Sequence, residues 1–174
     1  MNALLLYFSR KGENYLSGSI QYLKKGNTQV VAEIIGKHTG CALFHIQPIC
    51  PYSDDYSECI RQAKDDQKRG ARPALVALPE DIHKYDTVFL GYPNYWGTMP
   101  MPMFTLLEQI DLSRKTIFPF CTHEGGGFGT SLQDIQRLCP KALLKPGLAL
   151  TGSEIPIAEA MVSSWLACLG KENT

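Results

Sequence analysis

The sequence predicts a three-layer α/β/α domain whose centre is a five-stranded, parallel, doubly wound sheet with strand order 2-1-3-4-5. Two observations support this prediction. Short apolar segments typical of buried strands alternate along the chain with segments whose apolar residues recur at helical spacing. Right-handed crossovers between successive parallel strands then place helices on both faces of the sheet. The 174 residues, of which 44% are hydrophobic, suit a single domain covering residues 1–174.

The expected strands are four apolar segments and one shorter segment of mixed character. The four contain hydrophobic residues without regular polar alternation, as do strands that are buried on both faces. The last of them is less regular, because Pro146-Gly147 falls inside it. The mixed segment is expected at an edge of the sheet. In chain order the predicted strands are Ala3–Phe8, Ala42–Gln47, Thr87–Tyr92, Thr116–Cys121 and Leu143–Leu150.

Helices are predicted between the strands from capping signals and from apolar stripes. Asn27-Thr28 is an N-cap signal for the first helix, and Asp55 with Glu58 resembles a capping box for the second. Two prolines suit the first turn of the third helix. The apolar stripe expected for the last helix consists of Ile157, Met161, Trp165 and Cys168.

Charge and hydropathy exclude several classes of function. Lys plus Arg equals Asp plus Glu at 17 each, and this balance argues against a general nucleic-acid binder, which needs a positive excess. No apolar run approaches the roughly 20 residues that span a bilayer. The opening strand, Ala3–Phe8, is too short for a signal peptide and lacks a basic leader. A cytoplasmic protein without a membrane partner is therefore expected.

The six cysteines contain no C-x-x-C pair and no spacing typical of zinc ligands. Reduced thiols buried in a cytosolic protein explain them. Cys121 ends an apolar strand without a sharp G-x-C-x-G turn, so a core position is expected for it rather than a nucleophilic one. We therefore predict neither a catalytic residue nor a metal ligand.

Ligands of open parallel sheets bind beyond the carboxyl ends of the strands, where the winding direction switches. The first strand is followed by Ser9-Arg10-Lys11-Gly12 and, after a long stretch, by Gly26-Asn27-Thr28 at the start of a helix. Hydroxyls, glycine-freed amides and the positive end of the helix favour a phosphate here, and the two basic side chains would add charge. An ordinary capped helix after a turn explains the same residues. The motifs of nucleoside triphosphatases and of Rossmann dinucleotide sites are absent.

Two further strand ends complete the predicted ligand site. After the third strand, Pro93-Asn94-Tyr95-Trp96-Gly97 offers aromatic rings for a planar group, although one or both rings could belong to the core. After the fourth, Thr122-His123-Glu124-Gly125-Gly126-Gly127 lets backbone amides approach a ligand edge closely, although a flexible turn has the same composition. All three features fall at the correct strand ends, and together they favour a flavin nucleotide.

Four groups of residues, spread over essentially the whole chain, support a resemblance to a known family. They are Tyr7-Phe8-Ser9-Arg10, Gly26-Asn27-Thr28, Gly91-Tyr92-Pro93 with Trp96-Gly97-Thr98-Met99-Pro100, and Thr122-His123-Glu124-Gly125 with Gly127-Phe128-Gly129. With these residues the sequence resembles the flavodoxin family, and more closely a bacterial flavodoxin-like branch with a split phosphate loop.

This resemblance implies flavin mononucleotide (FMN) as the cofactor. The residues that it implies for the phosphate are Ser9, Lys11, Asn27 and Thr28. The flavin ring is implied to lie against the Pro93–Gly97 loop, with Trp96 or Tyr95 stacked on it. The Thr122–Gly127 loop is implied to hold the ring as well.

Two departures from the family pattern leave the function open. Glu13–Gly26 separates the two halves of the phosphate motif, and it is expected to form either a flap over the flavin or an interface between two copies of the chain in a homodimer. Electron-shuttling flavodoxins are usually acidic, whereas this chain has zero net charge. The partner is therefore either a redox protein or a small-molecule acceptor, as in an FMN-dependent NAD(P)H:quinone reductase. A flavin-free interaction module on the same fold is the third alternative.

Overall fold

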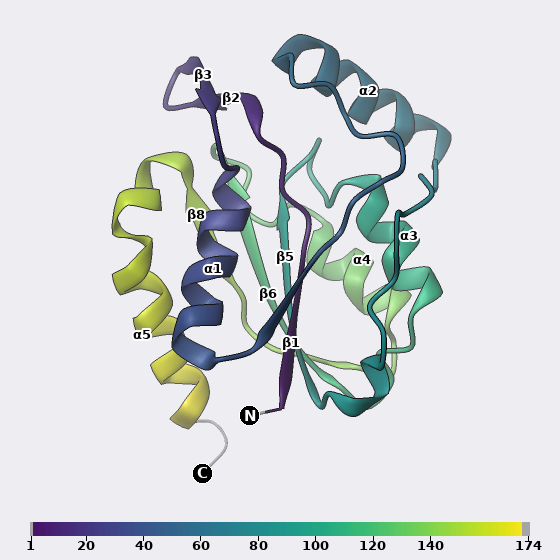
Figure 1. Ribbon diagram of the computed structural model, residues 1–174, viewed down its shortest axis with the longest axis vertical. Helices are drawn as coiled ribbons and strands as arrows, with labels where there is room; N and C mark the ends of the chain where they lie inside the picture. The colour runs from purple at the N-terminus through teal and green to yellow at the C-terminus, as the bar shows by residue number, and fades with distance from the viewer. Residues whose placement is uncertain (1, 172–174) are drawn as a thin grey trace.

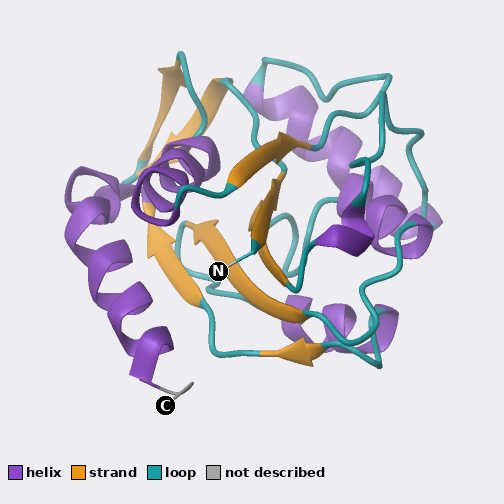
Figure 2. Cartoon of the chain, turned by 60° about the horizontal axis from the view of Figure 1, so that its bottom comes forward, coloured by secondary structure: helices purple, strands orange, loops and turns teal. Residues whose placement is uncertain are grey.

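The chain forms a central parallel sheet with helices on both faces, as the computed structural model shows for residues 2–171 (Figures 1 and 2). The strand order is β4-β1-β5-β6-β7, and β8 also pairs with β6. Every pairing in this sheet is parallel. The strands are β1 (Ala3–Tyr7), β4 (Ala42–His45), β5 (Thr87–Pro93), β6 (Thr116–His123), β7 (Leu143–Leu144) and β8 (Leu148–Thr151). The predicted fold class is thereby confirmed.

The helices divide between the two faces of the sheet. Helices α1 and α5 pack together on one face, and α3 and α4 lie on the other (Figure 1). Helix α2 contacts α3 and lies near the carboxyl ends of the strands (Figure 1). The helices are α1 (Asn27–Thr39), α2 (Tyr56–Arg69), α3 (Met101–Gln109), α4 (Ser131–Leu138) and α5 (Ala158–Lys171), with short 3-10 helices η1 (Ile82–Lys84) and η2 (Gly152–Ile157).

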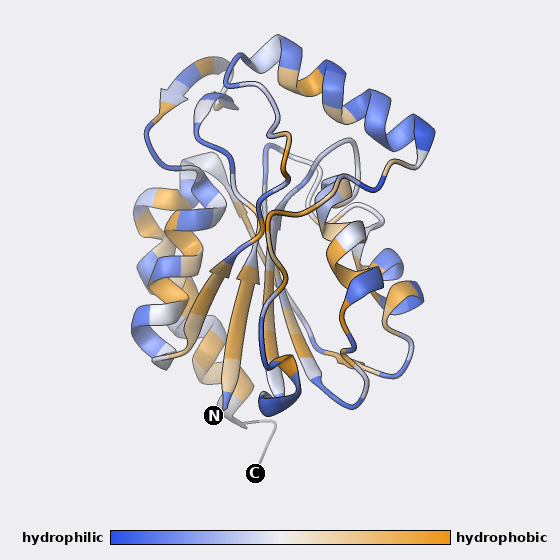
Figure 3. Ribbon diagram, turned by 45° about the vertical axis from the view of Figure 1, so that its right-hand side comes forward, coloured by the Kyte–Doolittle hydropathy of each residue, from blue (hydrophilic) through white to orange (hydrophobic). Residues whose placement is uncertain are grey.

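Alternation along the central strands produces two cores, one on each side of the sheet. In β1, Leu4 and Leu6 belong to the core beneath α3 and α4, whereas Leu5 belongs to the core beneath α1 and α5. The apolar colouring of the strands in Figure 3 reflects burial on both faces. These two cores hold the strand ends, and therefore the loops that follow them, in fixed positions.

The predicted last strand, Leu143–Leu150, is broken into β7 and β8. β7 pairs with the beginning of β6 and β8 with its end. Pro146 has no amide hydrogen for the ladder, and neither has Pro119 in the neighbouring β6. A side chain at Gly147 would also approach the Pro119 carbonyl to 2.6 Å. The sheet consequently has six strands rather than the five expected.

The long segment between the halves of the phosphate motif is an antiparallel hairpin of β2 (Gly12–Leu16) and β3 (Ser19–Leu23), not a loop. Ser17 and Gly18 form its two-residue turn with φ of 48° and 92°, the signs that a tight hairpin turn requires. The Ser-Gly pair, with strand-forming residues on both sides, is the sequence signal for this hairpin. A second long connection, residues 70–84, contains η1 and contributes no residue to the cavity described below.

Two helix predictions need correction. The N-cap of α1 is Gly26 rather than Asn27-Thr28. Gly26 has no side chain to cap the helix, and the Ser9 hydroxyl, from outside the helix, accepts from the Gln29 amide instead. The predicted stripe of the last helix is correct only in its middle: Met161 and Trp165 pack partly buried against the core, whereas Ile157 is 59% exposed and Cys168 is also exposed. The residues of α5 that are buried are Ala158, Val162 and Leu169, with Trp165 partly buried against Phe89 and Phe118.

The six cysteines are all free thiols, but only Cys59, Cys121 and Cys139 are buried. Cys50 and Cys168 are exposed, so the expectation of uniformly buried thiols is wrong. Burial raises the pKa of Cys121 to about 12, in agreement with its predicted place in the core. Within residues 2–171, none of the helices combines the length and apolar character needed to cross a membrane.

Candidate functional site

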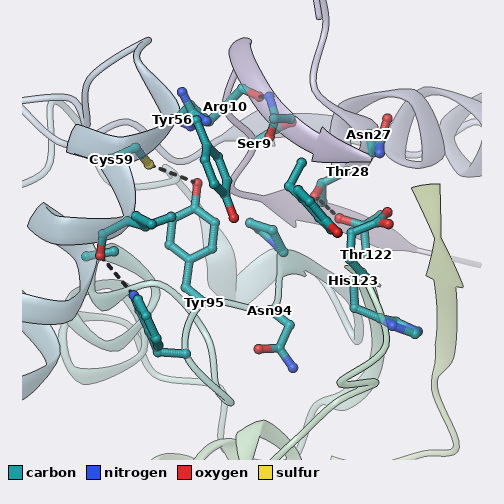
Figure 4. A pocket seen from close by; sticks show the side chains of 17 residues that line it. Ser9, Arg10, Asn27, Thr28, Tyr56, Cys59, Asn94, Tyr95, Thr122 and His123 are labelled. Atoms are coloured by element: carbon teal, nitrogen blue, oxygen red, sulfur yellow. Dashed lines mark hydrogen bonds between the residues drawn. The ribbon is translucent and has the colours of Figure 1, made fainter. Parts of the chain in front are cut away.

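A cavity of about 290 Å³ lies where β1, β5 and β6 end, at the edge of the sheet predicted to bind a ligand (Figure 4). Its walls come from the hairpin, the start of α1, the first turns of α2 and the loops after β5 and β6. The predicted site residues that line it are Ser9, Arg10, Asn27, Thr28, Pro93, Asn94, Tyr95, Trp96, Thr122, His123 and Glu124. Those that do not line it are Lys11, Gly97, Gly125, Gly126 and Gly127.

One side of the cavity is formed by the start of α1. The first-turn amides of a helix have no acceptor within the helix, and the helix dipole makes this end positive. The hydroxyl of Ser9 accepts a hydrogen bond from one of these amides, that of Gln29, at 3.1 Å. A Cβ at Gly26 would lie 2.3 Å from the Ser9 hydroxyl and 2.4 Å from the Arg10 carbonyl. The tight packing at Gly26 therefore brings Ser9 up to the helix end, where an anion would bind.

The two basic residues predicted near the phosphate differ in their positions. Arg10 donates to the carbonyls of Ser53, at 2.7 Å, and of Glu13, so its guanidinium joins the loop before α2 to the hairpin. Its Nε is buried and has no hydrogen-bond partner among the described residues. The side chain of Lys11 is exposed and lies outside the cavity wall. Of these two cations, only Arg10 lines the cavity.

The two aromatic residues of the second loop have different environments. The ring of Tyr95 packs edge-on against Phe8 and Tyr52, so it belongs largely to an aromatic cluster under the cavity. Trp96 is 46% exposed and has a φ of 54°, which is unusual for a residue with a side chain. Its indole N–H donates to the Ile60 carbonyl at 2.9 Å. This anchor to α2 holds an exposed ring at the rim of the cavity.

The glycine-rich loop is packed against the second loop. Asn94 bridges the two, since its side-chain amide donates to the Gly127 carbonyl at 2.8 Å and its oxygen accepts from the Gly97 amide at 2.9 Å. A Cβ at Gly129 would lie 2.0 Å from the Gly97 carbonyl. The amide of Gly125 donates to His123 Nδ1 at 2.9 Å. Gly129 therefore allows the two loops to pack closely, whereas Gly125 and Gly127 have positive φ angles and open space where a side chain would lie.

The Glu124 carboxylate connects segments that are far apart in the chain. One of its carboxylate oxygens accepts from the Ser17 amide, in the hairpin turn, at 3.0 Å. The other oxygen accepts from the Gly152 amide at 2.8 Å. Glu124 therefore links the hairpin tip to the third loop and to the segment after β8.

Six residues that line the cavity are not among the predicted ones. They are Asn14 and Tyr15 of the hairpin and Tyr56, Cys59, Ile60 and Ala63 of α2. The sequence does contain a signal for the second group, because a capped helix follows the predicted edge strand and its start must lie at the same edge of the sheet. The hairpin residues have no such signal, since only the folded position of the hairpin brings them to the cavity.

His45 does not line the cavity, but it contacts the segment that contains Ser9. Its ring stacks on Tyr7 with centroids 4.8 Å apart, and its Nε2 donates to the Ser9 carbonyl at 3.2 Å. Burial lowers the pKa of His45, although the bond to Ser9 opposes this shift. His45 lies on the edge strand β4, where it supports the loop that contains Ser9.

The comparisons with known proteins identify the family of the chain and solved structures with the same fold. A search of curated protein sequences finds no match. A proposed flavoprotein from Bacteroides eggerthii is 27% identical with a TM-score of 0.76, and the match covers 97% of this chain and 98% of that one. A second proposed flavoprotein, from Bacteroides uniformis, is 22% identical with a TM-score of 0.69 and coverage of 93% and 97%. A Lactobacillus acidophilus flavoprotein in complex with FMN is 21% identical with a TM-score of 0.65 and coverage of 89% and 96%. The family model described as Flavodoxin matches residues 18–169, and the chain therefore belongs to the flavodoxin family.

Proposed function

We propose that the chain binds FMN in this cavity and transfers electrons through it. The observation that supports the proposal most is that two unlike walls face one cavity. The start of α1, with Asn27 and Thr28, forms one side, and Cys59 and Tyr95 lie on the other (Figure 4). Membership of the flavodoxin family and the FMN complex of the similar Lactobacillus acidophilus protein support FMN as the cofactor.

The residues present fit FMN. The helix end and the Ser9 hydroxyl offer donors to a phosphate, and no carboxylate belongs to the first turn of α1. The buried Nε of Arg10 lacks a partner among the described residues, and an acceptor on a ligand in the cavity would satisfy it. The exposed indole of Trp96 suits a planar ring.

Bound FMN supplies the redox chemistry, and the protein supplies binding, orientation and electrostatics. Ser9, Asn27 and the first-turn amides of α1 would hold the phosphate end. Trp96 would shield one part of the ring from water, and its bond to Ile60 would keep the indole in place. The Asn94 bridge would keep the two ring loops at a constant separation.

The experiment that tests the proposal is the visible spectrum of the purified protein, followed by titration of the apoprotein with FMN. We expect flavin absorption bands and saturable uptake of one FMN per chain. A spectrum without flavin bands, together with no uptake of added FMN, would contradict the proposal and favour a flavin-free interaction module.

A second candidate is an FMN-dependent NAD(P)H:quinone reductase. The observation that favours it is the zero net charge, because a protein without excess charge does not steer itself toward a basic protein partner over long distances. The FMN-loaded protein should then oxidise NADPH stoichiometrically when a quinone is present. Negligible turnover would leave electron transfer to a partner protein as the function.

A further inference from the structure

The β2–β3 hairpin is fixed to the cavity at both of its ends. At its base, the Glu13 carboxylate accepts from the Tyr56 amide at 3.0 Å, and the Glu13 amide donates to the Asp54 carbonyl at 2.8 Å. At its tip, the Ser17 amide donates to Glu124, as described above. An isolated two-stranded hairpin is marginally stable in water. These contacts therefore decide where the hairpin lies.

Tyr15 lies on β2 between these two attachments, and it lines the cavity. Its ring stacks on Tyr56, the first residue of α2, with centroids 6.2 Å apart and an interplanar angle of 28°. The hairpin and α2 thus meet through an aromatic pair beside the cavity. Tyr15 nevertheless remains 43% exposed. Half-exposed aromatic surface on a cavity wall is typical of a binding site.

We propose that Tyr15, held by Tyr56, is a ligand-contacting wall of this site and recognises a planar π-system. This inference rests on the proposed function. The planar group is either the isoalloxazine ring of FMN or a flat aromatic acceptor, such as a quinone, beside it. In both cases the hairpin places an aromatic face on the cavity, in addition to the exposed indole of Trp96.

The hairpin provides its own control residue. Tyr22 is the cross-strand partner of Glu13, so the two side chains lie on the same face of the hairpin. Tyr15 lies on this face as well, because it is two residues from Glu13 on the same strand. It is 65% exposed and does not line the cavity. A Tyr22→Ala change removes the same type of side chain from the same small sheet, so any effect through hairpin stability appears in both variants.

The test measures the Kd of FMN for the apoprotein and the Kd of menadione for the FMN-loaded protein, in the wild type and in Tyr15→Ala, Tyr15→Phe and Tyr22→Ala. We expect Tyr15→Ala to weaken one of the two by about tenfold, the effect of one aromatic contact. In Tyr15→Phe, which keeps the ring, and in Tyr22→Ala, both dissociation constants should stay within about twofold of the wild-type values. Weaker FMN identifies the flavin as the planar group, and weaker menadione alone identifies the acceptor.

Two results would overturn the inference. In one, Tyr15→Ala leaves both dissociation constants unchanged. In the other, Tyr22→Ala changes them as much as Tyr15→Ala does, which would assign the effect to hairpin folding. In both cases the wild type still binds FMN, so the proposed function stands. Absence of FMN binding by the wild type would instead overturn the proposed function and this inference together.

Discussion

The hydroxyl of Thr28, on the first turn of α1, lies 2.7 Å from the hydroxyl of Thr122, near the end of β6. Both residues are buried, with 2% and 5% of their surface exposed. The pair joins two sides of the cavity that are 94 residues apart in the sequence, the helix end proposed for the phosphate and the loop proposed for the ring. The Thr28 hydroxyl is therefore already engaged within the protein.

Removal of one hydroxyl of this pair should cost stability. Thr28→Val leaves the buried Thr122 hydroxyl without its partner, so we expect the free energy of unfolding of the apoprotein to fall by about 1–3 kcal/mol. The double variant Thr28→Val/Thr122→Val should lose less than the sum of the two single variants, because neither hydroxyl is then left unpaired. Urea denaturation gives the free energy of unfolding of the wild type, the two single variants and the double variant. Simply additive losses would show that the two hydroxyls do not interact.

The close packing at Gly26 should be required for the phosphate of FMN. In Gly26→Ala the new Cβ collides with the Ser9 hydroxyl and the Arg10 carbonyl, so Ser9 must move away from the helix end. We expect the Kd of FMN to rise by roughly tenfold or more, the loss of one hydrogen bond to a charged group. Riboflavin, which lacks the phosphate, should be affected much less. Isothermal titration calorimetry with FMN and with riboflavin measures both dissociation constants. An equal loss of affinity for the two ligands would refute the phosphate assignment.

Trp96 should contribute to ring binding through its exposed indole. Trp96→Ala should raise the Kd of FMN about tenfold, because an aromatic contact of this kind contributes about 0.5–1.5 kcal/mol. It should also shift the reduction potential of the bound flavin, since more water reaches the ring. Trp96→Phe keeps a ring at the same backbone position and is the matched control. Unchanged affinity and potential in Trp96→Ala would exclude the stacking role.

His45 should make stability depend on pH. Because burial lowers its pKa below the ordinary value of about 6.5, the unfolded chain binds a proton on His45 more readily than the folded chain does. The contribution of His45 to the free energy of unfolding is therefore complete above the ordinary pKa, and it is lost as the pH falls through the pKa of the folded state. We expect His45→Gln to lose less free energy of unfolding than the wild type between about pH 7.5 and about pH 5. Parallel pH profiles from urea denaturation would contradict this assignment.

The strands could be predicted because burial on both faces leaves a simple pattern in the sequence. The predicted strand Ala3–Phe8 corresponds to β1, which ends one residue earlier, and Thr87–Tyr92 corresponds to β5, which ends one residue later. The hairpin at Gly12–Leu23 was harder, because most of it faces solvent or the cavity and no apolar run marks it. Its turn residues are the one local signal, and they are common in ordinary loops as well.

The sequence alone predicts the central strands of the sheet, the edge proposed for the ligand and the three loops that follow β1, β5 and β6. These features depend on local patterns and on the rule that carboxyl ends of parallel strands share one edge. Which side chains face the cavity depends instead on the folded arrangement of the chain. Arg10 became a link between segments, Glu124 a bridge to the hairpin, and Tyr15 a cavity residue. These roles depend on contacts between residues far apart in the chain, where packing and hydrogen bonding leave no periodic trace in the sequence.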